Sequence, residues 1–543
     1  MKQRLLCVLL AMLLCIGTMP VALAAEEDWM TSGDFQYELN SDGSANIMGY
    51  VGEGGDITIP ATLDGHPVKN LGMGYDGAFD IFKDDARITS VTIEEGIETI
   101  ATMMFMNCTN LTEVSLPSTL TTIGLNAFLN TGLTNLDGFA KANQVTALML
   151  SGCANLSDVD GLAGMTGLED LRVQNCPKIS DISGVSGLTN LETLHFYECN
   201  ISDLRPLSGL ANLKWLGLNG NVISDLSPIS GLTGLRQLNA EDNQITDLSS
   251  LAGMTGMDSL MLSGNQIKDV APLAGMTKLR MLWLDDNGLT DISPLATLTA
   301  LERLYLSDNA VTDISAVANM AQLGTFEANN NAALSNIDPL MGLDNLTMVS
   351  LTGTQVSGAD ALRLTRFDNL TTEAGEAGTR LEATLPVTVR YGNYDYVSQT
   401  ATFTSSDPDI AASVSGGASR LYYELGGNEG TATITASLDG VSKTFTITVG
   451  DIYELGDIDG NGKEYPDNAI NANDALLALR HSVKEINLAD DAAMAKLDIP
   501  AGALKRANVT AAKDPKEPLT QVDASDALQI LRYSVKEIDS FYA

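Results

Sequence analysis

The sequence predicts a mixed α/β protein: a solenoid of stacked parallel strands, then a β-sandwich spacer and a small all-α calcium-binding domain. Three observations support this. A leucine pattern recurs every 22 or 23 residues over 145–369, residues 379–450 alternate apolar and polar side chains, and two near-identical segments lie 52 residues apart near the C-terminus. A fixed period of this length is typical of solenoids, in which each unit buries its apolar face against its neighbours.

The charge of the chain excludes two classes of partner. Its 543 residues contain 69 acidic and 31 basic side chains, so the formal net charge is -38 and the isoelectric point is about 4.2. Nucleic acids and anionic lipids are bound by basic surfaces. We therefore expect neither as a general partner, and we expect no insertion into a membrane.

Residues 1–24 have the composition of a secretory signal peptide. Lys2 and Arg4 precede an apolar run from Leu5 to Ile16, and Ala22-Leu23-Ala24 offers a small-residue cleavage site. A membrane anchor is the alternative, but the run is shorter than the roughly 20 residues of a span. The mature protein is expected to be secreted and extracellular, and to be held at a cell surface only through another protein.

Residues 30–140 contain a first kind of repeat. Its pieces are NIMGYVGEGGDITIPATLDGHPVKNLG (46–72), SVTIEEGIETIATMMFMNC (90–108) and LTEVSLPSTLTTIGLNAFLN (111–130). They resemble BspA-like leucine-rich repeats. The resemblance implies that this region caps the N-terminal end of the solenoid and extends its sheet.

Ten units of a second repeat occupy residues 145–369. In LKWLGLNGNVISDLSPISGLTG (213–234), Leu216 and Leu218 alternate as one buried face of a strand, and Ser227-Pro228 predicts an N-cap before a short outer helix or 3₁₀ turn. These units resemble internalin-type leucine-rich repeats.

Two polar columns run through the second array. The first column follows each strand, where a buried side chain can satisfy turn backbone groups, and it holds Cys153, Cys176, Cys199, Asn221, Asn243, Asn265, Asn287, Asn309 and Asn331. Its three cysteines are expected to be buried thiols rather than a disulfide pair and an odd thiol. The second column is Asp158, Asp181, Asp203, Asp225, Asp247, Asp269, Asp291 and Asp313. It is expected to cap the outer turns, with a ladder of calcium sites as the alternative.

Strand positions that point away from the core form the concave face of such a solenoid. Aromatic side chains there have no core to fill, and aromatic residues dominate binding hot spots. The predicted ligand-binding residues on this face are His195, Tyr197, Trp215, Met261, Trp283, Asp285 and Tyr305. A protein or a glycan is the expected ligand, and mutual coverage of neighbouring side chains is the alternative explanation.

Residues 379–450 alternate apolar and polar side chains as short strands do, for example in LPVTVRY (385–391) and KTFTITV (443–449). The segments SSDPDIAASVS (405–415) and GTATITA (430–436) resemble a bacterial immunoglobulin-like group 2 domain. The resemblance implies a β-sandwich spacer.

The C-terminal segment 455–540 contains the near copies DALLALRHSVKEI (474–486) and DALQILRYSVKEI (526–538), the first preceded by GDIDGNGKEYPDNAINAND (456–474). It resembles a type I dockerin, a pair of calcium loop–helix units. The resemblance assigns calcium ligation in the first loop, across a six-residue insertion, to Asp457, Asp459, Asn461, Lys463, Asn471 and Asp474. In the second loop it assigns ligation to Asn508, Thr510, Asp523 and Asp526.

The second loop departs from the dockerin pattern, because Ala512 stands where a ligating side chain is expected. We expect one Ca²⁺ ion in the first loop, and the occupancy of the second loop stays open. In dockerins, two positions of each loop help to select the cohesin partner, and here they are Ala472, Asn473, Ala524 and Ser525.

No catalytic motif stands out. The three histidines belong to no H-E-x-x-H motif, and no G-x-S-x-G is present. The sequence thus predicts a secreted, non-catalytic binding protein. Its solenoid binds a protein or glycan, and its dockerin docks onto a cohesin of a cellulosome-like or cell-surface assembly. The alternatives are a free-standing surface adhesin or host-interaction protein, and a polysaccharide-degrading enzyme component.

Overall fold

The computed structural model describes residues 29–72, 81–372, 376–393 and 395–450. Contacts divide the chain into two compact units. The first unit ends at Ser357 and also takes in residues 390–393, and the second begins at Gly358. The predicted signal peptide and the whole predicted dockerin lie outside the described residues.

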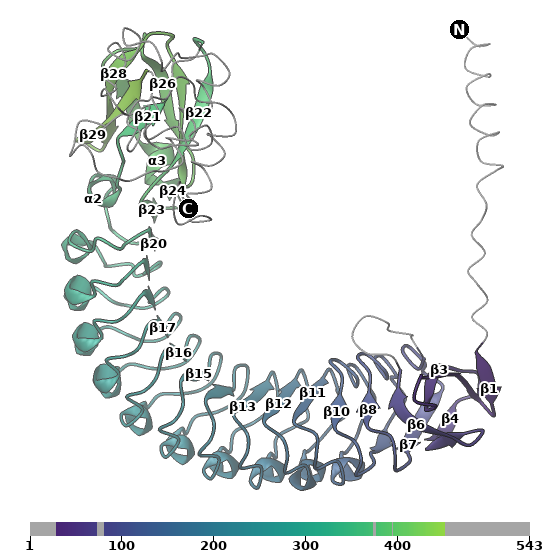
Figure 1. The fold of residues 1–543 in the computed structure, drawn as a ribbon. Helices are drawn as coiled ribbons and strands as arrows, with labels where there is room; N and C mark the ends of the chain where they lie inside the picture. The colour runs from purple at the N-terminus through teal and green to yellow at the C-terminus, as the bar shows by residue number, and fades with distance from the viewer. Residues whose placement is uncertain (1–28, 73–80, 373–375, 394, 451–543) are drawn as a thin grey trace, which may run out of the picture. The chain divides into compact units, whose positions relative to one another are not determined.

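The N-terminal part of the first unit is a short antiparallel meander that leads into parallel strands (Figure 1). One sheet has the order β1-β2-β3-β6-β8-β10, made of Met30–Ser32, Phe35–Leu39, Ala45–Tyr50, His66–Leu71, Thr99–Ile100 and Thr122–Ile123, with β5 (Thr62–Leu63) on β6. A second sheet pairs β4 (Gly55–Ile59), β7 (Ile88–Ile93) and β9 (Glu113–Ser115).

Stacked phenylalanines form the core of these N-terminal repeats. Phe82, Phe105 and Phe128 are fully buried, and their successive ring centroids lie 5.3 and 5.6 Å apart in nearly parallel planes. Because each repeat supplies one ring at the same place, the column packs neighbouring repeats against one another.

The second array is a single parallel sheet along one side of the coils, with a 3₁₀ turn on the opposite side of each coil (Figure 1). Its strands β11 to β20 are Ala147–Ser151, Asp170–Gln174, Thr193–Tyr197, Trp215–Gly217, Gln237–Asn239, Ser259–Met261, Met281–Trp283, Arg303–Tyr305, Thr325–Glu327 and Met348–Thr352. The turns η1 to η10 are Asp137–Phe139, Asp160–Gly164, Ser183–Val185, Arg205–Leu207, Ser227–Ile229, Ser249–Leu251, Ala271–Gly275, Ser293–Thr297, Ser315–Asn319 and Asp338–Leu340.

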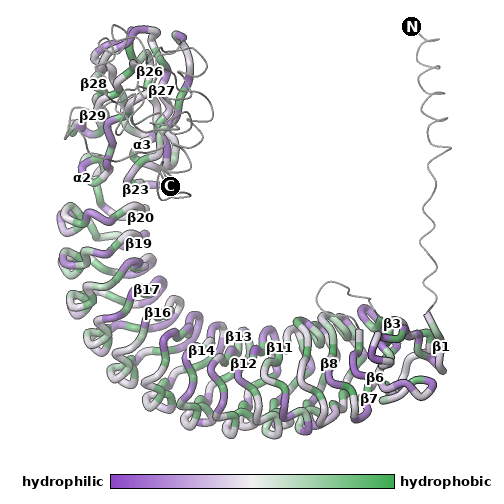
Figure 2. Tube along the Cα trace, in the orientation of Figure 1, coloured by the Kyte–Doolittle hydropathy of each residue, from purple (hydrophilic) through white to green (hydrophobic). Residues whose placement is uncertain are grey.

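Apolar residues recur at the same place in every coil and face the interior (Figure 2). Leu216 and Leu218 of one coil are 1% and 0% exposed, as the alternation in the sequence predicts. The predicted parallel register is also confirmed, since Leu216 pairs with Leu194 on one side and Leu238 on the other.

The asparagine column joins consecutive coils. Asn265 is 8% exposed, and its Oδ1 atom accepts a hydrogen bond of 2.9 Å from the Ile245 amide of the preceding coil. Its Nδ2 atom donates to the carbonyl oxygens of Ala240 and Leu262 at 2.9 and 3.0 Å. One buried amide thus satisfies backbone groups of two coils, as the sequence predicts.

The aspartate column caps the outer turns, which confirms the expected role of these residues. The Oδ1 atom of Asp225 accepts a 2.8 Å hydrogen bond from the Ser227 amide, and the same contact recurs in most other coils. The expected N-cap was wrong: Leu226 is the N-cap residue and makes no side-chain cap, while Ser227 and Pro228 lie inside the 3₁₀ turn. The side-chain acceptor is instead Asp225, one residue before the N-cap residue Leu226, because the turn is too tight for an α-helical N-cap.

The four described cysteines are free thiols, as expected for Cys153, Cys176 and Cys199. Cys108, Cys153 and Cys176 are buried, whereas Cys199 is half-buried. Burial raises the pKa of Cys108 to about 12 and that of Cys199 to about 11. The thiols of Cys108 and Cys199 are therefore protonated and unreactive near neutral pH.

One expectation for the N-terminal repeats was wrong. They do not extend the sheet of the second array, because β10 and β11 belong to separate sheets. The strand β10 is only two residues long, so the strand ladder is interrupted before β11, although the Asn130 amide still donates to the Ser151 carbonyl oxygen at the end of β11.

The second unit begins earlier than the end of the array predicted at residue 369. It contains α2 (Gly358–Leu364) and two sheets with one shared core of buried residues from Leu385 to Val449. The four-stranded sheet has the order β21-β29-β28-β25, made of Leu370–Thr372, Val441–Val449, Gly430–Leu438 and Thr402–Ser405. The three-stranded sheet has the order β22-β27-β26, made of Arg380–Thr384, Arg420–Leu425 and Ala411–Gly416. The remaining elements of this unit are β24 (Asp395–Tyr396) and α3 (Val397–Thr400), whereas β23 (Thr388–Gly392) falls mostly in the residues that belong to the first unit.

Within the described ranges, no helix has both the length and the apolar character needed to cross a membrane.

We predict that Asn265→Ala destabilises the solenoid strongly. It leaves the Ile245 amide and two carbonyl groups without their partner, and each buried unsatisfied group costs about 1–3 kcal/mol. Urea unfolding followed by circular dichroism measures the loss. The control is Asn212→Ala, which removes one exposed hydrogen bond to the Thr189 carbonyl oxygen and should cost less than about 1 kcal/mol. Equal losses in the two variants would contradict the role of the column.

Candidate functional site

The concave face of the second array is organised in rows, because the parallel strands are in register. The central row joins one residue of each strand: Met149, Arg172, His195, Gly217, Asn239, Met261, Trp283, Tyr305, Glu327 and Ser350. Neighbours in such a row lie about 4.8 Å apart, so their side chains contact one another.

Two predicted residues form an aromatic pair in the central row. The rings of Trp283 and Tyr305 are stacked, with centroids 5.2 Å apart and planes 6° apart. Met261 is in register with Trp283 on one side, and Glu327 is in register with Tyr305 on the other. All four side chains are half-buried, so their outer edges stay open to solvent.

Asp285 lies beside this pair, since it follows Trp283 by two residues and points to the same face. Its Oδ1 atom accepts a 2.7 Å hydrogen bond from the Ser307 amide, and its Oδ2 atom accepts a longer bond of 3.3 Å from the Ser263 hydroxyl. Burial raises the pKa of Asp285 despite these bonds. The carboxylate is thus held in place by the following and the preceding coil at a cost in solvation.

Two more carboxylates flank Asp285. Burial raises the pKa of Glu241, and the negative charges of Asp242 and Asp285 raise it further. Burial and the charge of Asp285 likewise raise the pKa of Glu327, and the positive charge of Arg390 offsets this rise in part. In the part of the chain that the structure describes, Glu241 and Asp285 form no ion pair.

A second aromatic pair lies toward the N-terminal end of the array. The rings of His195 and Tyr197, both on β13, are stacked with centroids 4.9 Å apart. Tyr197 extends over Gly217 of the next strand, where a Cβ atom would lie 2.3 Å from its ring. Glycine at this place leaves room for the tyrosine to lie across the sheet.

Trp215 lies in a different row from both pairs and is 41% exposed. The Lys214 Nζ atom lies 6.0 Å from its ring centroid and also pairs with Glu192. The seven predicted residues therefore all lie on the concave face, but in separate places: His195 with Tyr197, then Trp215, then Met261 with Trp283, Asp285 and Tyr305.

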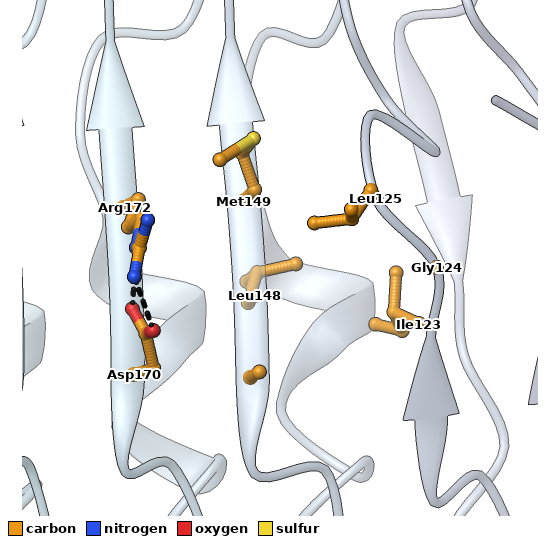
Figure 3. Close-up of a pocket in the computed structure, with 8 residues that line it drawn as sticks. Ile123, Gly124, Leu125, Leu148, Met149, Asp170 and Arg172 are labelled. Carbon is orange, nitrogen blue, oxygen red and sulfur yellow. Dashed lines mark hydrogen bonds and ion pairs between the residues drawn. The ribbon is translucent and has the colours of Figure 1, made fainter. Parts of the chain in front are cut away.

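Sequence reasoning missed a small cavity where the two repeat types meet (Figure 3). Its volume is about 140 Å³, and Ile123, Leu125 and Met149 line its apolar side. Across it, Asp170 and Arg172 form a bidentate ion pair with both contacts at 2.9 Å. The change of repeat between residues 140 and 145 was the signal that could have predicted it, since a change of unit interrupts the sheet.

The predicted calcium ligands and cohesin-contacting residues all lie outside the described residues. Within the described residues, no group of three or more His, Cys, Asp or Glu side chains could hold a metal ion. The candidate site is the concave face, which presents aromatic edges and carboxylates.

Comparisons with known proteins agree with this geometry. The family model described as BspA type leucine rich repeat region matches residues 78–202, and the one described as leucine rich repeats matches overlapping windows from 189 to 319. The internalin InlF of Listeria monocytogenes is 30% identical over 50% of this chain and 82% of its own, with a TM-score of 0.42. The chain belongs to the leucine-rich repeat family.

A second structure, internalin C2 of Listeria monocytogenes, is 35% identical over 35% of this leucine-rich repeat protein and 83% of its own chain, with a TM-score of 0.34. None of the curated proteins matches the sequence. The family models thus confirm the predicted BspA-type repeats, and they confirm leucine-rich repeats in the second array. The BspA-type match extends past the predicted boundary at residue 140, and the family matches end at residue 319.

We predict opposite effects for one substitution at two aspartates of this leucine-rich repeat protein. The pKa of Asp285 is raised in the folded state, so its contribution to stability is present at low pH and is lost as the pH rises through that pKa. Asp285→Asn should therefore raise the unfolding midpoint at pH 7. The pKa of Asp247 is lowered by hydrogen bonds from Ser249, so its contribution is present at pH 7 and is lost as the pH falls. Asp247→Asn should lower the midpoint.

Thermal unfolding at pH 7 and at pH 4 measures both effects. The difference between the two variants should shrink at pH 4, because the raised pKa of wild-type Asp285 makes the loss of its charge by protonation begin at a higher pH than for an ordinary aspartate. A lower midpoint for Asp285→Asn at pH 7 would show that its charge is compensated in the fold.

Proposed function

We propose that this leucine-rich repeat protein is a secreted, non-catalytic binding protein whose concave face holds a protein or glycan ligand. The observation that carries the proposal is the placement of aromatic side chains on that face, with Trp215 exposed and Trp283 stacked on Tyr305. None of these rings fills the core, and partly exposed aromatic residues are the usual anchors of interfaces.

The arrangement of the titratable groups favours binding over catalysis. Asp285 is bonded to Ser307 and Ser263 of the following and preceding coils, so the sheet fixes it in place. His195 is stacked on Tyr197, and burial and the nearby charge of Arg172 lower its pKa. Asp285 and His195 come from strands four coils apart, whereas acid–base catalysis needs its groups within reach of one reacting atom.

We further propose that the C-terminal segment is a dockerin that binds Ca²⁺ and docks onto a cohesin of a scaffold or cell-surface assembly. The sequence of the first loop supports this, since Asp457, Asp459, Asn461 and Asp474 supply oxygen ligands at calcium-loop spacing. The two sheets of the second unit would then be the immunoglobulin-like spacer between binding face and anchor.

The concave face is tested by Trp215→Ala combined with Trp283→Ala in the mature protein. Loss of two anchors should weaken ligand capture by about tenfold or more, while circular dichroism and the unfolding midpoint change little, because neither ring is in the core. The ligand is sought by co-purification from the native secretome. The control is Trp29→Ala, which removes a tryptophan that precedes the repeats. Capture that survives the double change would place the binding face elsewhere.

The anchor is tested by capture of the mature protein on a panel of immobilised cohesins. Capture should require Ca²⁺, should be lost with a chelator and should be lost in Asp457→Ala with Asp459→Ala, because these residues are predicted first-loop ligands. Asn508→Ala should have a smaller effect, since the second loop departs from the dockerin pattern. Surface attachment without residues 451–543 would favour a free-standing adhesin instead.

A further inference from the structure

The carboxylates of the concave face gather over strands β15 to β19. Glu241, Asp285 and Glu327 point to this face, and Arg303 is the one basic residue of the concave rows there. Asp242, Asp286 and Asp308 follow the same strands in left-handed backbone conformation and are exposed beside them. Toward the N-terminal end, by contrast, Asp170 is paired with Arg172.

The acidic patch, defined as Glu241, Asp285 and Glu327, surrounds the Trp283–Tyr305 stack. Glu327 is in register with Tyr305, and Asp285 lies two residues beyond Trp283 on the same strand side. The negative charges of Glu241 and Asp285 repel each other, and Ser263 lies on the strand side between them and donates its hydroxyl to Asp285. Aromatic rings beside carboxylates are suited to a cationic side chain, whose stem packs on the rings while its charge meets the carboxylates.

A buried hydroxyl in the neighbouring row gives a second, independent observation. Ser259 is 3% exposed although it belongs to the concave side of β16, and its Oγ atom has no hydrogen-bond partner. It lies two residues before Met261 and in register with Met281. Buried polar groups are nearly always paired in folded proteins, so an unpaired one on a binding face is a place for a polar group of a ligand.

We propose that strands β15 to β19 bind a cationic segment of a partner protein, with a lysine or arginine side chain packed on Trp283 and Tyr305 and paired with Asp285 and Glu241. This rests on the proposed function, and it narrows the ligand from a protein or glycan to a basic polypeptide. Charge complementarity is the reason, because a neutral glycan would leave these partly buried carboxylates uncompensated.

In the free protein, the partly buried charges of Asp285 and Glu241 reduce the stability of the fold, and pairing with a cationic partner would remove this loss. Asp285 and Glu241 are partly buried, close enough to raise the proton affinity of Glu241, and without an ion pair among the described residues. Charges in this state destabilise the fold rather than support it. An asparagine at position 285 could accept the bond from the Ser307 amide through its oxygen and donate to the Ser263 hydroxyl through its NH₂ group, so the fold itself does not require a charge at this place.

The test measures binding of a fluorescent peptide that alternates lysine and glycine to the mature protein, by anisotropy at physiological salt and pH 7. A peptide that alternates glutamate and glycine and a neutral cello-oligosaccharide are the comparison probes. The lysine peptide should bind, and Glu241→Gln with Asp285→Asn should weaken it by about tenfold or more. Trp283→Ala should weaken it by about threefold to tenfold.

The matched control is Asp258→Asn, which removes one exposed negative charge just before β16 and outside the concave rows. Because the whole chain is acidic, this variant reports non-specific attraction, and it should change the affinity by less than about twofold. Raising the salt should weaken the wild type more than the double variant.

Equal affinity of the lysine peptide for the wild type and the double variant would overturn the inference, as would no binding of this peptide at all. Preference for the cello-oligosaccharide would also overturn it while leaving the concave face as the binding site. The proposed function itself fails only if the Trp215 and Trp283 double variant still captures the native ligand.

Discussion

The structure depends on one recurring interaction, that of the buried or half-buried asparagine that follows each of the strands β14 to β19. A coil of this kind has a strand of three to five residues and no helix longer than a 3₁₀ turn, so it cannot satisfy its own backbone groups. Asn221, Asn243, Asn265 and their successors accept from an amide of the preceding coil and donate to carbonyl oxygens of the preceding coil and of their own coil. This fixes the spacing and the register of the strands, and hence the rows of side chains on the concave face.

Because the core leucines and the asparagine column hold the coils together, the side chains of the concave face are not needed to hold neighbouring coils in contact. Tyr197 can lie across Gly217, and Trp215 can stay exposed, without a loss of packing in the core. The same freedom permits arrangements that cost stability, such as the partly buried Asp285 and the unpaired Ser259 hydroxyl. Groups of this kind are concentrated over β15 to β19, which is why that part of the face, rather than the aromatic residues alone, indicates the chemistry of the ligand.

The period of the sequence was enough to predict the strands and their facing residues, because a repeat of constant length places equivalent residues in one row. It therefore put Trp283, Asp285 and Tyr305 on one face. It could not predict that the Trp283 and Tyr305 rings stack, nor that Tyr197 turns toward Gly217, since side-chain torsions depend on neighbours from other coils. The N-cap at Ser227 was wrong because its local pattern suits an α-helix, whereas the coil leaves room only for a 3₁₀ turn capped by Asp225. The end of the sheet at β10 depends on how two repeat types meet, which neither repeat shows alone.

The acidic character of the chain has two physical origins that act in opposite directions. Asp181, Asp203, Asp247 and Asp291 accept hydrogen bonds from turn amides, which lower their pKa and make their charge stabilising. Burial raises the pKa of Glu241, Asp285 and Glu327, and the first two have no ion-pair partner among the described residues, whereas Arg390 partly compensates the charge of Glu327. The net charge of -38 alone therefore says little about the partner. The carboxylates that the fold does not compensate are more informative, because they mark the place where a positive charge of a partner would be stabilised.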